Sequence, residues 1–377
     1  MAAKLTDSTR RSYAAGWDGW ALWCRVRGRS PYLSGQNREE RMADEDELLR
    51  FITFHHAAYG RKASTLRQKL FAIRYAHGLA GYGDPTEGKR RVWTALEGFR
   101  RWDGGVKRKY PVTPRMLWWL QDHLFGEEGG DAVVIWAAIM TAYFFMLRAS
   151  EYLLRPGAAW SYERVVRGID VCGFRDGEAR DWLGDCDEVA LTVTSSKTDQ
   201  HFNGCVRNHF RSGERLCVVE ALAMLQCELP QRFGKGEEAE QPLFRYRDGR
   251  HLSREQVQAY LSMAAVAEGI DPGKMGSHSL RIGGATALYH SVRDLEAVKR
   301  FGRWTTDCYH IYLHEDHERQ RGFAKGMSQG SLLLAQTAGK QDIVGEPSYG
   351  GIDQASWGWA KRATSRDGGR DDRGPGR

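Results

Sequence analysis

The sequence lacks several features that would place it in a class of protein at once. It contains no apolar run of the roughly 20 residues needed to cross a bilayer. Its first residues, 1–11, are polar, which predicts that no secretory leader is present. The seven cysteines are scattered and odd in number, with no CxxC or Cys/His spacing. We therefore expect an intracellular protein with reduced thiols, no metal site, no membrane partner and no small-molecule substrate.

The charge of the chain is unevenly distributed. The 377 residues carry a net charge of +7, and this length fits two domains with a tail. Residues 1–110 contain 22 Lys and Arg against 12 Asp and Glu, a balance of +10, so the remainder sums to −3. An excess of this kind is typical of a surface that binds a phosphate backbone. An ordinary solvated basic surface explains it equally well.

The N-terminal third has the periodicity of a small helical bundle. Apolar residues at helical spacing predict helices over about 8–24, 45–58, 65–78 and 87–102, the first with Ser8 as its N-cap. We assign residues 1–103 to a helical DNA-binding domain. Its candidate DNA-binding side chains lie on the outer side of the third helix and at the end of the fourth, and they are Arg67, Lys69, Arg74, Arg100 and Arg101.

A short basic segment follows this bundle. Residues 104–112 combine paired glycines, a basic run and a proline, a composition typical of a linker. Lys107, Arg108 and Lys109 are further candidates for contacts with DNA phosphates. A nuclear localisation signal or a merely solvated linker would have the same composition.

Residues 113–325 have the pattern of a second, mixed domain. Thr113 is an N-cap candidate, and residues 131–145 are apolar nearly all round, which predicts a central buried helix. Period-two alternation predicts antiparallel strands over 164–171 and 188–194. Helices are expected over 216–229, 279–290 and 294–301, and from Ser253, where Gln256 completes a capping box. The predicted fold is mainly α with a small antiparallel β-sheet. Residues 326–377 are expected to be a largely disordered tail.

Several polar residues of the second domain could carry chemistry. Arg148 leaves the apolar helix with Glu151 as its nearest ionic partner. Lys197 follows the second strand in a turn-like segment, and His278 and Arg281 share one side of a helix start. Trp304 precedes a group of aromatic residues. Each of these features, taken alone, has an ordinary structural explanation.

Their order and spacing carry more information than any one of them. The strings LRASE, SKTDQ, HSLRIGGATAL and GRWTTDCYHIY resemble the catalytic series of the tyrosine recombinases, the phage-integrase superfamily. At the level of organisation the resemblance covers residues 8–325. It implies an N-terminal helical core-binding domain, SAM-like in fold, and an α+β catalytic domain. SKTDQ and GRW look most like integrases of eukaryotic mobile elements of the DIRS-like and Crypton-like groups.

The chain departs from the bacterial members of that family at three points. Met146 stands where they usually have glycine, and Trp304 stands where they often have histidine. Their tyrosine tends to lie nine residues beyond that position, whereas Tyr312 lies eight residues beyond Trp304 and Tyr309 lies five. Tyr312 is therefore the favoured nucleophile, with Tyr309 as its alternative.

The resemblance implies a reaction as well as a fold. DNA strands would be cut and rejoined through a 3′-phosphotyrosyl link without a cofactor or metal ion. The implied catalytic residues are Arg148, Lys197, His278, Arg281, Trp304 and Tyr312, and Glu151 would orient Arg148. Two arginines can hold the phosphate oxygens, and Lys197 suits the protonation of the leaving oxygen. The expected partners are double-stranded DNA and other copies of the chain, as a homotetramer at synapsis. In a eukaryotic host we expect a nuclear protein.

Two other functions fit the same residues. One is a catalytically silent DNA-binding protein that descends from a mobile element. The other is a type IB topoisomerase, which shares the chemistry but acts as a monomer.

Overall fold

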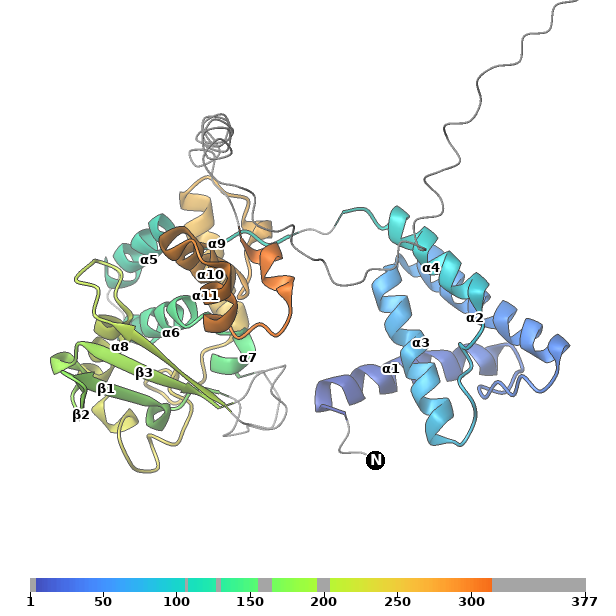
Figure 1. The fold of residues 1–377 in the computed structure, drawn as a ribbon, viewed down its shortest axis with the longest axis horizontal. Helices are drawn as coiled ribbons and strands as arrows, with labels where there is room; N and C mark the ends of the chain where they lie inside the picture. The colour runs from blue at the N-terminus through green and yellow to red at the C-terminus, as the bar shows by residue number, and fades with distance from the viewer. Residues whose placement is uncertain (1–4, 106–107, 127–129, 155–164, 195–203, 314–377) are drawn as a thin grey trace, which may run out of the picture. The chain divides into compact units, whose positions relative to one another are not determined.

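The computed structural model of the protein describes residues 5–105, 108–126, 130–154, 165–194 and 204–313. The predictions that concern Lys107, Lys197 and the tail 326–377 lie outside these residues. The chain divides into two compact units, Met1–Lys109 and Tyr110–Arg377, and Figure 1 shows the elements of each. None of the described helices is long and apolar enough to cross a membrane.

The first unit is built from four helices. They are α1 (Asp7–Val26), α2 (Arg38–Tyr59), α3 (Ala63–Leu79) and α4 (Arg90–Trp102). The N-cap of α1 is Thr6, whose hydroxyl accepts a hydrogen bond from the backbone of Thr9, and not Ser8 as the sequence suggested. Helix α2 begins earlier than expected, because the side chain of Asn37 caps it by accepting from the backbone of Glu40.

The core of this unit is aromatic and aliphatic. Trp20, Phe51 and Leu70 are fully buried, and Trp20 meets Phe51 edge to face with ring centroids 5.2 Å apart. Helices α1 and α3 cross closely at Gly16, where a Cβ atom would lie 2.7 Å from Cβ of Ala72. A glycine is therefore required at that crossing.

The second unit is centred on a buried helix, as the sequence predicted. Helix α6 (Ala132–Phe144) is apolar all round, and Trp136 and Met140 are inaccessible or nearly so. Helix α5 (Pro114–Gly126) precedes it and begins at Thr113, whose hydroxyl accepts from the backbone of Met116. The single-turn α7 (Ala149–Tyr152) follows.

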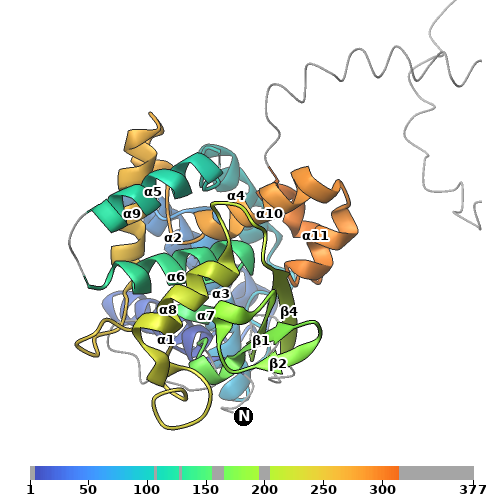
Figure 2. The ribbon, with the colours of Figure 1, turned by 90° about the vertical axis from the view of Figure 1, so that its left-hand side faces the viewer.

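A four-stranded antiparallel sheet packs beside this helix. Its order is β2-β1-β3-β4, from β1 (Val171–Arg175), β2 (Glu178–Arg180), β3 (Glu188–Val193) and β4 (Cys205–Phe210). The strand predicted over 188–194 is confirmed. The one predicted over 164–171 is wrong, because residues 168–170 form a 3₁₀ turn in which Asp170 accepts from Arg167, and the strand begins only at Val171. Figure 2 shows the sheet with α8 (Val218–Glu228) beside it.

The remaining helices close the second unit. They are α9 (Arg254–Ala267), with the expected Ser253–Gln256 capping box, α10 (Ser279–Val292) and α11 (Leu295–Phe301). Helix α10 lies directly on the backbone of α6, since a Cβ on Gly284 would lie 2.1 Å from the carbonyl oxygen of Tyr143. This close approach brings the start of α10 to the end of α6. The short 3₁₀ helix η6 (Asp307–Tyr312) ends the described chain beside α10.

Candidate active site

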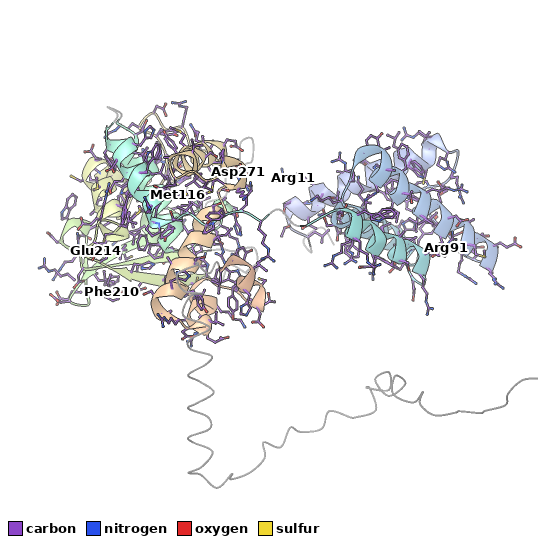
Figure 3. The ribbon with its side chains drawn as sticks, turned by 90° about the horizontal axis from the view of Figure 1, so that it is seen from above. Arg11, Arg91, Met116, Phe210, Glu214 and Asp271 are labelled. Atoms are coloured by element: carbon purple, nitrogen blue, oxygen red, sulfur yellow. The ribbon has the colours of Figure 1, made fainter. Side chains whose placement is uncertain are left out.

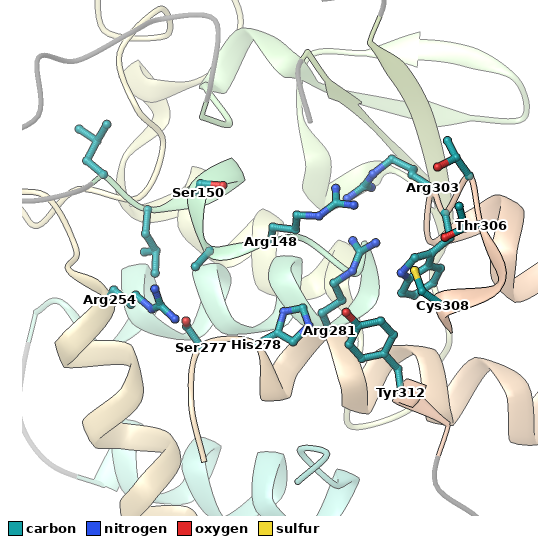
Figure 4. Close-up of a pocket in the computed structure, with 15 residues that line it drawn as sticks. Arg148, Ser150, Arg254, Ser277, His278, Arg281, Arg303, Thr306, Cys308 and Tyr312 are labelled. Carbon is teal, nitrogen blue, oxygen red and sulfur yellow. The ribbon is translucent and has the colours of Figure 1, made fainter. Parts of the chain in front are cut away.

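A pocket of about 490 Å³ lies where α7, α9, α10 and the segment after α11 meet. Figure 4 shows the side chains that line it. Five of the six residues predicted to be catalytic are among them: Arg148, His278, Arg281, Trp304 and Tyr312. Glu151 is buried behind Arg148, and Lys197 lies outside the described residues. Residues that are as much as 164 positions apart in the chain are thus gathered on one surface.

A strained turn presents Arg148. Helix α6 ends at Phe144, and the chain reverses at Met146, which adopts a left-handed backbone conformation with φ of 49°. A non-glycine residue in that region costs of the order of 1–3 kcal/mol, and such residues concentrate at functional sites. The guanidinium of Arg148 donates to Oε1 of Glu151 at 2.8 Å, while its backbone amide donates to Oε2. Glu151 therefore fixes both ends of Arg148.

Arg281 is almost completely buried, and the protein backbone holds it in place. Its side chain is 1% exposed and donates to the carbonyl oxygens of Met146 and Gly302. Its Cζ atom lies 4.2 Å from the centroid of the Trp304 ring. Burial lowers the pKa of Arg281 to about 9, with further contributions from the charges of Arg148 and Arg303, so the group remains protonated at neutral pH.

Gly302 allows the Trp304 ring to take its position. A Cβ on Gly302 would lie 1.6 Å from an atom of that ring, so the indole folds back over its own chain. The ring is 8% exposed and lies between Arg281 and Tyr312, with centroids of the two aromatic rings 5.5 Å apart. Trp304 is thus one wall of the site.

Arg303 is a third buried guanidinium that the sequence analysis did not select. It adopts φ of 60° and donates to Glu151 at 2.7 Å and to the carbonyl oxygens of Phe145 and Met146. Burial is also the main reason that its pKa is lowered. Trp304 was selected from the GRW string. Nothing in the sequence indicated that Arg303 shares the carboxylate of Glu151 with Arg148.

The imidazole of His278 is neutral in this environment. Burial, followed by the positive charges of Arg281, Arg148 and Arg254, lowers its pKa to about 4. The ring meets the Tyr312 ring edge to face at 5.0 Å between centroids. A neutral imidazole beside a phenol can accept its proton.

Tyr312 and Tyr309 have different surroundings. Tyr312 lines the pocket, and Figure 4 shows its hydroxyl directed toward Arg281. Its carbonyl oxygen accepts a hydrogen bond of 2.9 Å from the hydroxyl of Thr286 on α10. Tyr309 is 3% exposed and packs behind Trp304. Burial and the charge of Asp307 raise its pKa, and the pocket arginines are not among its charged neighbours.

The pocket has a surplus of positive charge. Arg148, Arg254, Arg281 and Arg303 supply four positive charges against one negative charge from Glu151, a net charge of +3. Such a site favours an anion whose oxygens can accept several hydrogen bonds, such as a phosphodiester. No group of three or more His, Cys, Asp or Glu side chains in the described part of the chain could hold a metal ion.

Comparison with known proteins agrees with this chemistry. Residues 212–319, which include His278, Arg281, Trp304 and Tyr312, match the model of the phage integrase family. This part of the second unit is similar to that family. None of the curated proteins matches the sequence.

Solved structures with a similar arrangement include three proteins bound to DNA. XerH recombinase with its difH substrate is 14% identical in sequence, with a TM-score of 0.40 over 85% of this chain and 97% of that chain. A lambda integrase dimer on a COC′ core site is 14% identical, with a TM-score of 0.48 over 83% of this chain and 91% of that chain. The Tn1549 transposon integrase with transposon right end DNA is 14% identical, with a TM-score of 0.45 over 83% of this chain and 99% of that chain.

The pocket also contains residues that the sequence did not indicate. Arg254 lines one end of the pocket from the first turn of α9, next to Ser277. Arg254 appeared in the sequence only as the residue after an N-cap, and Ser277 only as the residue before His278. Their placement depends on how α9 packs against the start of α10, which local sequence does not encode.

The basic residues predicted to bind DNA lie in the other unit. Arg67 pairs with Glu97 at 3.1 Å, Arg74 pairs with Asp84 at 2.8 Å, and Arg100 lies 4.0 Å from Glu97. Arg101, Arg108 and Lys109 are exposed. Lys69 differs from its neighbours, because it is half-buried against Gly16 and Gly19 of α1. Figure 3 shows the similar surface position of Arg91, which pairs with Asp46.

Proposed function

We propose that the protein is a site-specific DNA recombinase or integrase, which cuts and rejoins strands through a 3′-phosphotyrosyl intermediate. One observation carries this proposal. Arg148, Arg281, His278, Trp304 and Tyr312 come from three separate segments of the chain and meet in one positively charged pocket. The match of residues 212–319 to the phage integrase family supports it.

The proposed reaction begins with attack of the Tyr312 oxygen on the phosphorus of a DNA phosphodiester. A phosphorus–oxygen bond to tyrosine forms, and the bond to the 5′-oxygen breaks. Arg148 and Arg281 bind the non-bridging oxygens, where negative charge accumulates in the transition state. His278, whose ring meets that of Tyr312, would donate to the same phosphate or help to deprotonate the phenol. We assign protonation of the leaving 5′-oxygen to Lys197, and attack by a 5′-hydroxyl of another strand reverses the step.

Finer proposals accompany the reaction. Residues 1–103 would bind the DNA core site through Arg67, Lys69, Arg74, Arg100 and Arg101, and the linker 104–112 would add Lys107, Arg108 and Lys109. Four copies of the chain would assemble at synapsis. The SKTDQ and GRW strings favour a mobile element of the DIRS-like or Crypton-like type and a nuclear location. The catalytic domain would extend over residues 113–325.

The decisive experiment is covalent trapping on nicked suicide substrates taken from the ends of the surrounding genomic element. Wild-type protein should form a complex with DNA that survives denaturation, whereas Tyr312→Phe should form none. Tyr309→Phe is the matched control and should still form the complex, because that hydroxyl lies outside the pocket. Equal trapping by wild type and Tyr312→Phe would refute Tyr312 as the nucleophile.

The two alternative functions predict other outcomes of the same assay. A silent DNA-binding protein would shift the DNA without any covalent product. A type IB topoisomerase would form the covalent product and would also relax supercoiled DNA at protein concentrations too low for assembly. A recombinase should join two sites only at concentrations that permit several copies to meet.

A further inference from the structure

One end of the pocket is not used by the proposed reaction. Arg148, Arg281 and Tyr312 occupy the central part, while Arg254 and Ser277 line the end formed by α9 and the start of α10. The pocket volume of about 490 Å³ corresponds to roughly 16 water molecules at about 30 Å³ each. A single phosphate group does not fill that space.

Ser277 is a buried hydroxyl without a partner. The residue is 1% exposed, and its Oγ atom makes no hydrogen bond in the described structure. A buried polar group in this state costs free energy, so native proteins rarely retain one without a use. Figure 4 shows the hydroxyl directed toward the side chain of Arg254.

Arg254 is an exposed cation without a carboxylate. Among the described residues its guanidinium forms neither an ion pair nor a hydrogen bond. The positive charge of Arg254 also reaches His278. The Arg254 guanidinium and the Ser277 hydroxyl are thus two hydrogen-bond donors without acceptors at this end of the pocket. An anion bound there would accept hydrogen bonds from both.

We propose that Arg254 and Ser277 form a second phosphate-binding subsite, which holds a DNA phosphodiester next to the one that reacts. The assignment of the anion to DNA rests on the proposed function. Arg254 has five N–H donors and binds the phosphate oxygens, and the Ser277 hydroxyl donates to the same group. The subsite fixes the strand beside the reacting phosphorus, so it contributes to affinity and register.

The test compares three variants in binding to a short fluorescent duplex over a range of NaCl concentrations. Arg254→Gln should reduce the slope of log K against log salt by about 0.9, because one phosphate contact is lost. Arg250→Gln is the matched control. Arg250 is equally exposed but pairs with Asp248 and does not line the pocket, so its slope should equal that of wild type.

Ser277→Ala separates binding from folding. If the hydroxyl serves a ligand, its removal should weaken binding severalfold while Tm stays the same or rises, since an unpaired buried group disappears. A lower Tm for Ser277→Ala, or wild-type binding by either Ser277→Ala or Arg254→Gln, would overturn the subsite. These measurements require no strand cleavage. Failure of the subsite is therefore distinguishable from failure of the recombinase reaction, which the Tyr312→Phe trapping assay decides by itself.

Discussion

Arginine is used differently in the two units of this protein. In the helical unit, Arg67 and Arg74 lie at the surface, and each pairs with a carboxylate. In the second unit, Arg148, Arg281 and Arg303 are largely buried, and Glu151 pairs with both Arg148 and Arg303. Backbone carbonyl groups accept further hydrogen bonds from Arg281 and Arg303. The exposed arginines of the helical unit thus pair with surface carboxylates, whereas the buried arginines of the second unit depend on one carboxylate and on the backbone.

The largest expected difference between the two units is the stability lost when a carboxylate partner of their arginines is removed. Glu151→Gln should lower the free energy of unfolding of the second unit by about 3–5 kcal/mol, because it leaves buried guanidinium groups uncompensated. Glu97→Gln in the helical unit removes an exposed partner of Arg67 and should cost less than about 1 kcal/mol. Calorimetry that follows the transition of each unit measures both values. Equal losses would mean that burial does not distinguish the two sets of arginines.

A second prediction concerns Arg303 as a positioning residue. Arg303→Lys should slow formation of the covalent DNA complex about 100-fold at saturating DNA, or about 2.7 kcal/mol, because one ammonium cannot contact Phe145, Met146 and Glu151 together. DNA affinity and its salt dependence should not change, since Arg303 acts through Glu151 on Arg148. Arg91→Lys, at an exposed arginine that pairs with Asp46, is the surface control and should leave the cleavage rate unchanged. A loss of affinity in Arg303→Lys would instead indicate direct contact with DNA.

The third prediction concerns pH. The pKa of His278 is about 4 in the folded protein and about 6.5 in an unfolded chain, so the unfolded state binds the proton first as pH falls. Wild-type stability should therefore decrease as the pH drops from about 6.5 to about 4. The shift sets an upper limit of about 3 kcal/mol, which solvent screening at this partly exposed ring reduces. His278→Gln should flatten the stability curve in that window, and an unchanged curve would contradict the assignment.

The smallest expected effect is the change in stability when either of two glycines of the helical unit is replaced by alanine. A Cβ on Gly98 meets nothing within 4 Å, so Gly98→Ala should stabilise α4 by about 0.5–1 kcal/mol. Gly16→Ala should destabilise the unit, because its Cβ would contact Ala72 at 2.7 Å. Urea unfolding measures both differences. A stabilising Gly16→Ala would show that the α1–α3 crossing is loosely packed.

Periodicity in the sequence predicted the helices well because most of them have one continuous apolar face or, in α6, no polar face. The prediction failed over residues 164–171, where apolar and polar residues alternate as they do in a strand. There the local ion pair of Arg167 with Asp170 stabilises a 3₁₀ turn instead. Side chains compete with the backbone for such hydrogen bonds, and alternation alone does not reveal this competition.

The candidate site could be predicted only in part, for a related reason. Arg148, His278, Arg281, Trp304 and Tyr312 were found because their order and spacing match a known series. The sharing of Glu151 with Arg303 depends on a left-handed backbone at residue 303 and on the contact between α10 and α6. Ser277 and Arg254 also required the tertiary structure, since nothing in their local sequence distinguishes them from a surface serine and arginine.

The hydrogen bond from Thr286 to the backbone of Tyr312 has a consequence for the working assembly. It ties Tyr312 to α10, the helix that carries Arg281, so the proposed nucleophile and the arginines of the pocket belong to the same copy of the chain. Each copy would then act with its own complete set of groups. A mixture of Tyr312→Phe and Arg281→Ala subunits should not complement each other, whereas subunits that exchange their tyrosines would regain activity on mixing.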